Sequence, residues 1–503
     1  MGTRHGALAT VTLIAMALLG CSAAPGGPEA DQSASAQQQR DFPAVYAQQV
    51  DWRECGPEFG LPSDFEQQQL AVGEQVRGLR CTMIAAPLDW DDPQNAETIE
   101  IFAVHIPSTG DAPIGTLLMN PGGPGLPGAD FATGTTGTPG FAAVHQQYDL
   151  LGFDPRGIGR STPVECPEDT SIPALRYALC AEAIPLVNSM GSGQVARDMD
   201  LMRHLVGDKL LHYAGFSYGT VLGSQYATLF PERVGRILLD SPMTSDWASA
   251  LDRYQQAEAF SRSLTEFVSG CSTEFQLEIC PMHDETSLRE TYERLDAAPL
   301  IATNGQTVSR TSFYEYLSGI LYTAPPERKA ALRLAGLAVT GDQAAIDTLA
   351  ATMADSFQTL NFNGLIVSCL SAPPKENLAE LYRYIHEYGL PHDLGGPEVT
   401  DERLRGLFSL DCNGLPGSGR DYLPFTNTSG VPILILAVTG DHATPYAGAQ
   451  TLLGELGDAR LATLHGSGHI ASFQGRSRCA DDIATAYLLR GELPAEGTIC
   501  QVD

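Results

Sequence analysis

The chain has 503 residues, of which 30 are Lys or Arg and 60 are Asp or Glu, so its formal net charge at pH 7 is −30. A surface this acidic repels nucleic acid and anionic lipid, which argues against a nucleic-acid partner and against electrostatic attachment to a membrane. The length suits one large domain with an insertion, or two domains.

The N-terminal segment predicts export. Arg4 precedes an apolar run from Ala7 to Gly20, which is too short to span a bilayer and is typical of a signal peptide, here residues 1–20. The run ends in Leu-Leu-Gly-Cys21, which resembles a bacterial lipobox, so we expect lipidation at Cys21; an ordinary cleaved signal is the alternative. Residues 21–50 are small, polar and rich in Pro and Gly near their start, which predicts a lipidated tether rather than a fold. We therefore expect the protein on the outer face of the cell membrane, held only by this anchor, or secreted.

The cysteine count agrees with export. Eleven cysteines occur and none forms a C-x-x-C pair, which argues against zinc ribbons and thioredoxin chemistry. Without Cys21 the number is even, and an even number in an exported chain favours disulfides. The sequence alone leaves the connectivity open, and our working prediction pairs nearest neighbours: Cys55–Cys81, Cys166–Cys180, Cys271–Cys280, Cys369–Cys412 and Cys479–Cys500.

Strand and helix patterns alternate from the end of the tether to about Pro242. The predicted strands cover residues 98–106, 114–120, 148–154, 210–217 and 234–240, and the predicted helices cover 193–207 and 219–230. Such alternation predicts an α/β fold with a parallel, doubly wound sheet.

After Pro242 the pattern becomes mostly helical and stays so to about Phe425, after which strand patterns return at residues 431–441 and 459–469. A helical block therefore interrupts one α/β domain. The expected organisation is a first core part at 51–242, a helical cap at 243–425 and a C-terminal core part at 426–503.

The strongest chemical motif is G-x-S-x-G at residues 215–219, between a predicted strand and a predicted helix. A sharp strand-to-helix turn with small flanking residues exposes the hydroxyl of Ser217 above the sheet, and the helix N-terminus lies beneath the developing oxyanion. We therefore predict that Ser217 is a catalytic nucleophile.

A nucleophilic serine needs a base and an acid that orients the base. Asp441 and His469 each follow a predicted C-terminal strand, in the chain order that this architecture requires. His442 and His465 are close rivals for the base, but His442 follows the wrong strand and His465 is expected within its strand. We predict the triad Ser217, Asp441 and His469.

A glycine-rich loop, NPGGPGLPGAD at residues 120–130, spells G-x-G-x-x-G, the formal dinucleotide-binding fingerprint. Its prolines lack two amide donors that a phosphate cradle would use, and Asp149 begins the next strand, whereas a ribose-binding acid should end it; Asp154 ends it but belongs to the DPRGIG segment. The position upstream of the Ser217 turn favours an oxyanion loop instead. We predict that the amides of Gly123 and Tyr218 form the oxyanion hole, with Gly122 as the alternative to Gly123.

Several segments together resemble the secreted tripeptidyl aminopeptidase-like serine hydrolases of actinomycetes, relatives of prolyl aminopeptidase. They include CTMIAAPLDWDDP, LLMNPGGPGLPG, LLGFDPRGIGRS, LHYAGFSYGTVLGSQYATLFPERVGRILLDSP, GDHATPYAGA and the C-terminal GSGHIASF to GTIC. The resemblance covers roughly Cys55 to the C-terminus. It implies an α/β-hydrolase with a helical cap, and it assigns the nucleophile, acid and base to Ser217, Asp441 and His469.

One position departs from that family. Its members often carry an acid in a pattern like I-x-C-x-D-x-P, where this chain has Ser371 between Cys369 and Pro373. We take that acid to help hold the free ammonium of a substrate, which a hydroxyl does much less well than a carboxylate. Glu376 or Asp411 could substitute for it.

Three functions remain open from the sequence. The first is an exopeptidase that releases short peptides from free N-termini through an acyl-enzyme, without a metal or organic cofactor. The second keeps the triad but acts on esters or lipids, as Ser371 and the apolar cap segments suggest. The third is a non-catalytic, envelope-binding lipoprotein. Peptide and small-ester substrates are the expected partners, and the oligomeric state does not follow from the sequence.

Overall fold

The protein is described here by a computed structural model. The structure describes residue 2 and residues 33–166, 173–323, 325–354, 358–375, 377–389 and 411–503. Apart from residue 2, the predicted signal peptide lies outside the described residues, as do the predicted lipidation site Cys21 and the first part of the predicted tether.

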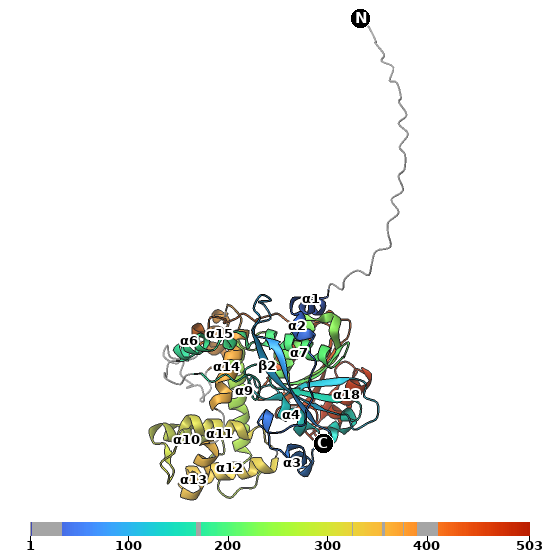
Figure 1. Cartoon of the computed structure of the whole chain (residues 1–503). Coiled ribbons are helices and arrows are strands. Elements are labelled where there is room, and N and C mark those ends of the chain that lie inside the picture. Colours follow the sequence, from blue (N-terminus) through green and yellow to red (C-terminus); the bar gives the residue numbers. More distant parts are fainter. Residues whose placement is uncertain are drawn as a thin grey trace.

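A single large sheet organises the core (Figure 1). Its strand order is β1-β2-β4-β3-β5-β6-β9-β10-β11. The pairs β1–β2 and β2–β4 are antiparallel, and the remaining neighbours are parallel. The strands are β1 Arg80–Pro87, β2 Thr98–Ile106, β3 Thr116–Asn120, β4 Asp149–Phe153, β5 Leu211–Phe216, β6 Val234–Asp240, β9 Ile433–Gly440, β10 Ala459–Ser467 and β11 Ile499–Gln501.

Helices cover both faces of this sheet, as the buried apolar strands require. One face packs against Met199 of α7, Tyr226 of α8 and Leu452 of α17, and the other against Ala132 of α4 and Ala484 of α18. The helices that accompany the sheet are α3 Phe65–Ala71, α4 Gly128–Thr135, α5 Ala142–His145, α6 Pro173–Ala183, α7 Ser192–Leu205, α8 Gly219–Leu229, α17 Tyr446–Leu456 and α18 Arg478–Arg490.

The helical insertion between β6 and β9 has two parts rather than one core. Its helices are α9 Ala250–Ser269, α10 Glu285–Ala297, α11 Arg310–Ile320, α12 Pro325–Val339, α13 Gln343–Ala354, α14 Gln358–Ser371 and α15 Leu378–Tyr388. The helices α10 to α13 and the short strands β7 Leu300–Ile301 and β8 Thr307–Val308 form a lobe with its own apolar core, which includes Phe313 and Leu349. Ile366 of α14 packs instead into the core of the sheet domain. Figure 1 shows the lobe at the lower left, joined to the rest by α9.

Residues 33–47 differ from the expected tether. They form α1 Ala34–Asp41 and α2 Pro43–Tyr46, which pack on α7. Ser35 is fully buried and its hydroxyl donates to Asp200 at 2.8 Å, as does the Tyr46 hydroxyl at 3.1 Å. A segment that buries polar side chains against a carboxylate looks hydrophilic in the sequence, which is why composition alone suggested a tether.

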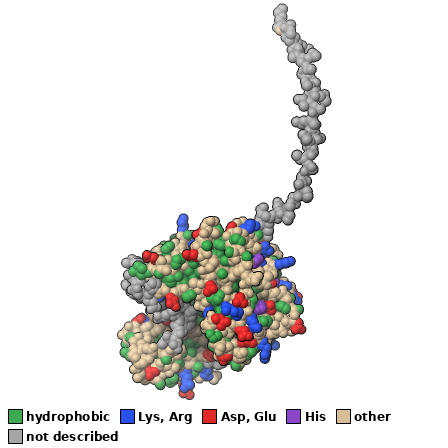
Figure 2. All heavy atoms as spheres, viewed as in Figure 1, with side chains coloured by type: hydrophobic (Ala, Val, Ile, Leu, Met, Phe, Trp, Pro, Cys, Tyr) green, Lys and Arg blue, Asp and Glu red, His purple; other side chains and the backbone are tan. Residues whose placement is uncertain are grey.

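Five disulfides join Cys55–Cys81, Cys166–Cys180, Cys271–Cys280, Cys369–Cys412 and Cys479–Cys500, the nearest-neighbour pairs that we predicted. Such bonds persist in oxidising compartments and fit an exported protein. Among the described residues, no helix is both long and apolar enough to cross a bilayer. Figure 2 shows one face of the molecule, where acidic side chains lie dispersed among neutral and basic ones.

A buried ion pair anchors the loop after β4. Arg156 and Asp198 of α7 are both fully buried, and two guanidinium nitrogens of Arg156 lie 2.6 and 2.8 Å from the two carboxylate oxygens. Arg156 also donates to the carbonyls of Leu88 and Ser189, and Trp90 donates its indole N–H to Asp198 at 2.8 Å. The DPRG segment therefore serves the fold, because the side chain of Arg156 is fully buried.

Candidate active site

Ser217 lies in the sharp turn between β5 and α8. Its φ is 54°, in the left-handed region that a non-glycine residue rarely adopts. The flanking glycines permit the turn: a Cβ on Gly215 would lie 2.4 Å from the carbonyl oxygen of Gly219, and a Cβ on Gly219 would lie 2.5 Å from that of Asn120. The motif thus has the strained strand–turn–helix context that a nucleophile elbow requires.

Asp441 and His469 come together after β9 and β10. The His469 Nδ1 atom lies 2.9 and 3.0 Å from the two carboxylate oxygens of Asp441. The same carboxylate accepts the amides of Ala443 and Thr444, each at 2.9 Å. Burial raises the pKa of the Asp441 carboxyl, but attraction to His469 and these hydrogen bonds outweigh burial and leave the pKa below its usual range. The ionised Asp441 carboxylate accepts the proton-bearing Nδ1 of His469, which leaves Nε2 of His469 available as a base.

Ser217 and His469 are not joined by a hydrogen bond in the part of the chain that the structure describes. Such bonds are often long before a substrate binds. Ser217 and the residues just after His469 are nevertheless bonded to Asp240, at the end of β6. The Ser217 amide donates to the Asp240 carbonyl at 2.9 Å, and the Asp240 carboxylate accepts the amides of Ala471 and Ser472, each at 2.8 Å.

Asp240 is a positioning residue that the sequence did not reveal. It is fully buried, and burial raises its pKa to about 6, although hydrogen bonds from Ser472 and from the Ala471 amide oppose the shift. It lies between the candidate nucleophile and the histidine loop because β6 separates β5 from β9 in the sheet. The next residue, Ser241, also accepts the amide of Ile470 at 3.0 Å.

The glycine-rich loop packs directly on the Ser217 turn. A Cβ on Gly122 would lie 2.8 Å from the amide nitrogen of Tyr218, so only glycine fits there. The Gly122 amide already donates to the Asn120 side chain at 2.9 Å. Within the described residues, the amides of Gly123 and Tyr218 donate to no other group. This difference favours Gly123 over Gly122 as the partner of Tyr218 in an oxyanion hole.

Asp154, at the end of β4, holds this loop, whereas Asp149 lies at the other end of that strand. The Asp154 carboxylate accepts the amide of Ala129 at the start of α4, at 3.1 Å, and the amide of Arg160 at 2.9 Å. Burial raises the pKa of Asp154 to about 6. Asp149 accepts the amide of Ser108 at 2.8 Å. Neither acid serves as a ribose ligand in this arrangement, and the dinucleotide alternative receives no support.

The two rival histidines occupy different settings. His465 lies within β10, as expected. His442 is 1 % exposed, and its ring packs against Phe260 of α9 and Tyr322, with ring centres 5.1 and 4.8 Å apart. Burial lowers the pKa of His442 to about 3, although the Asp441 carboxylate opposes the shift. His442 is therefore a neutral neighbour of the Asp441–His469 pair.

This neutral state predicts a pH effect on stability. Between pH 6.5, the ordinary pKa, and about pH 3, the unfolded chain binds a proton at His442 that the folded chain does not. The free energy of unfolding therefore falls as the pH falls through this window. Relative to His442→Phe, the natural protein should lose about 2 kcal/mol between pH 7 and pH 5. Urea unfolding of both proteins at the two pH values measures this, and parallel pH profiles would contradict a neutral His442.

Ser371 does not face a substrate cavity. It is 3 % exposed, and its hydroxyl lies 2.9 Å from that of Ser192, which in turn lies 2.8 Å from the Tyr218 hydroxyl. The buried hydroxyl of Ser371 links α14 to α7 and the Ser217 turn, which agrees with the departure from the family at this position. Glu376 and the side chain of Asp411 lie outside the described residues.

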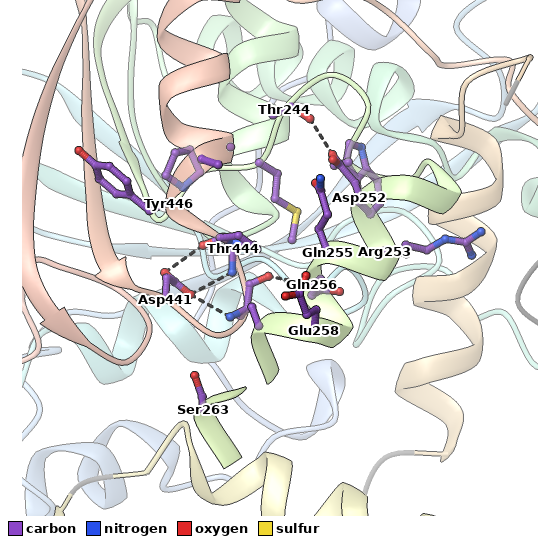
Figure 3. Close-up of a pocket in the computed structure, with 18 of the residues that line it drawn as sticks. Thr244, Asp252, Arg253, Gln255, Gln256, Glu258, Ser263, Asp441, Thr444 and Tyr446 are labelled. Carbon is purple, nitrogen blue, oxygen red and sulfur yellow. Dashed lines mark hydrogen bonds between the residues drawn. The ribbon is translucent and has the colours of Figure 1, made fainter. Parts of the chain in front are cut away.

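A cavity of about 630 Å³ adjoins the site on the side of α9. It reaches Gly123 of the glycine-rich loop and Asp441. Figure 3 shows Gln256 and Glu258 pointing from α9 toward the Asp441 loop, whereas Arg253 extends away from it. The carboxylates that line the cavity outnumber the guanidinium groups: Asp252, Glu258, Glu266 and Asp441 against Arg253 and Arg262. This composition favours a cationic group.

Comparisons with known proteins agree with the fold. Residues 115–277 match a family model described as alpha/beta hydrolase fold, and residues 400–500 match one described as TAP-like protein. The chain therefore has the α/β-hydrolase fold, and its C-terminal part is similar to the TAP-like proteins.

Three relatives indicate which kind of hydrolase this chain is similar to. Serine protease Hip1 of Mycobacterium tuberculosis is 27% identical over 548 residues, which cover 98% of this chain and 96% of the relative. Tripeptidyl aminopeptidase of Streptomyces lividans is 27% identical over 489 residues, with coverages of 90% and 86%. Carboxylesterase B of Mycobacterium tuberculosis is 26% identical over 507 residues, with coverages of 91% and 91%. This α/β-hydrolase is thus a serine hydrolase, and its predicted resemblance to the tripeptidyl aminopeptidase-like enzymes of actinomycetes is confirmed.

Proposed function

We propose that the protein is an exported peptidase that releases short peptides from free N-termini. Ser217 attacks the scissile carbonyl, and His469 takes the serine proton and passes it to the leaving amine. Asp441 orients the imidazole, and the amides of Gly123 and Tyr218 hold the oxyanion. Water then hydrolyses the acyl-enzyme with His469 as base. These groups supply the whole reaction, so the mechanism uses no metal or organic cofactor.

The observation that carries this proposal is Glu258 in the cavity beside the glycine-rich loop. One of its oxygens lies 3.6 Å from Arg262, and the other accepts the Tyr384 hydroxyl. A substrate ammonium that leaves water needs a compensating charge, and a carboxylate with fixed partners supplies it. In this proposal Glu258 takes the role that we attribute to the family's acid at the position of Ser371.

The relatives support this choice. One is named a tripeptidyl aminopeptidase and another a serine protease, and both match this chain over most of its length. A substrate amine bound at Glu258 would lie at a fixed distance from Ser217. That distance would set how many residues fit between the amine and the scissile bond, and so the length of the released peptide.

Glu258→Gln tests the anchor. We expect this variant to lower kcat/KM on a free-amine tripeptide anilide by about tenfold to a hundredfold, because the amide oxygen of glutamine is a neutral and weaker partner for the ammonium than a carboxylate. The N-acetylated twin of the substrate should be affected little, since it carries no ammonium. Glu290→Gln, on α10 outside this cavity, is the matched control. Equal losses on both substrates would place the ammonium elsewhere.

A second function is favoured by the apolar part of the same cavity. Met243, Trp247 and Leu365 line it, and one relative is named a carboxylesterase. Ester hydrolysis uses the same acyl-enzyme chemistry with an alcohol as leaving group. An enzyme of this kind would turn over the acetylated peptide or a short-chain ester at least as well as the free-amine peptide.

We also propose that Cys21 carries the lipid that holds the mature chain on the outer face of the cell membrane. The lipobox-like residues before Cys21 support this. The first described helix, α1, begins just after its N-cap Ser33.

A further inference from the structure

Tyr322 stands beside the candidate base without a role in the mechanism above. It follows α11, in the lobe at the lower left of Figure 1. Its ring centre lies 5.6 Å from that of His469, and the two ring planes meet at 86°. The residue is nevertheless 54 % exposed. A tyrosine that touches the base and still presents half of its surface is available to a bound substrate.

The local structure holds this ring in place. Arg328 of α12 donates to the carbonyls of Leu321 and Thr323, at 2.6 and 2.8 Å, on either side of Tyr322. Leu321 is buried in the core of the lobe. The buried ring of His442 packs against the Tyr322 ring, with the ring centres 4.8 Å apart. The ring is therefore pre-organised, which lowers the entropy cost of a contact with substrate.

We propose that Tyr322 contacts the leaving group and selects for a flat apolar or aromatic substituent on it. In a peptide this substituent is the side chain of the first residue after the scissile bond, and in an ester it is the alcohol. In the acylation step, a bond forms between Ser217 Oγ and the acyl carbon, and the bond from that carbon to the leaving nitrogen or oxygen breaks. The serine proton passes through His469 to the leaving atom, so the step is balanced without a co-reactant.

The position of His469 supports this assignment. A general acid must lie within hydrogen-bond reach of the atom that it protonates, about 3 Å. A ring centred 5.6 Å from the imidazole therefore lies within reach of groups attached to the leaving atom. Edge-to-face contacts between aromatic rings form at centroid separations of about 4.5–7 Å. Glu258, in contrast, belongs to the cavity on the α9 side and concerns the acyl part of the substrate.

The test uses two substrates with one acyl part, a free-amine tripeptide joined to phenylalanine amide or to glycine amide. Tyr322→Leu should lower the ratio of kcat/KM for the phenylalanine substrate over the glycine substrate by about threefold to tenfold. Tyr322→Phe should keep the ratio, because the ring remains. The deacylation rate should stay unchanged in both variants, because the leaving group has departed before that step.

The matched control is Tyr382→Leu, on α15, where the tyrosine is 51 % exposed and outside the residues of the site. An unchanged ratio in Tyr322→Leu, or an equal slowing of deacylation, would overturn the proposal and leave Tyr322 as a packing residue of the lobe.

The inference rests on the proposed function only in taking Ser217 and His469 as the reacting pair. If the free amine proves unnecessary, the acetylated forms of the two substrates carry the same test. If only esters react, benzyl and ethyl esters of one acyl group replace the amides. Loss of amine preference and loss of leaving-group preference are therefore measured separately.

Discussion

Ser217→Ala is expected to lower kcat by roughly a millionfold, the scale seen when a serine hydrolase loses its nucleophile. The hydroxyl is the only group placed to form the acyl-enzyme in the proposed mechanism, so residual turnover comes from substrate binding and the oxyanion hole alone. The measurement is the initial rate on any substrate that the natural protein hydrolyses. A serine-reactive phosphonate should add its mass to Ser217 in the natural protein and should leave the variant unlabelled.

Stability is the control for this variant. Alanine retains the Cβ, so the strain at φ 54° persists and the thermal unfolding midpoint should change little. A variant that keeps more than a tenth of the natural rate, or natural protein that is labelled at another serine, would show that the nucleophile lies elsewhere. Absence of both rate and labelling in the natural protein would favour the non-catalytic lipoprotein.

Arg156→Met is expected to give the largest loss of stability from one substitution. It leaves the fully buried carboxylate of Asp198 without its cation, and breaking such a pair from one side costs about 3–5 kcal/mol. Urea unfolding with the disulfides intact measures the loss. Because α7 and the loop after β4 both depend on this pair, activity should fall only as the folded fraction falls.

The matched double variant separates charge from packing. Arg156→Met with Asp198→Leu removes both buried charges and should be more stable than Arg156→Met alone, although Trp90 then loses its acceptor. A loss below about 1 kcal/mol in the single variant would mean that water reaches Asp198, contrary to its complete burial.

Sequence patterns within short segments predicted the strands and the turn at Ser217, whose structures depend mainly on neighbouring residues. The apolar runs that became β3, β5, β6 and β9 bury both faces, which is the pattern of central parallel strands. The turn at Ser217 follows from its two flanking glycines. The sequence left the disulfide connectivity open, and the working prediction of nearest-neighbour pairs was confirmed.

Features that depend on distant partners were not predictable. Asp240 is one strand-ending acid among several in the sequence, and its role depends on Ala471 and Ser472, more than 200 residues away. Ser35 looks like a linker residue until Asp200 is placed beside it. Ser371 shares its position with an acid in the resembling family, but its contact with Ser192 follows only from the packing of α14 on α7.

The most direct test of the central claim compares three substrates on soluble protein that begins just after Cys21. They are a free-amine tripeptide anilide, its N-acetylated twin and a short-chain nitrophenyl ester, each also assayed with Ser217→Ala. We predict that the free-amine peptide has by far the highest kcat/KM and that the variant hydrolyses none of the three at a comparable rate. An acetylated peptide or ester that reacts equally well or better would contradict an aminopeptidase and define the protein as an esterase or a broad-specificity hydrolase.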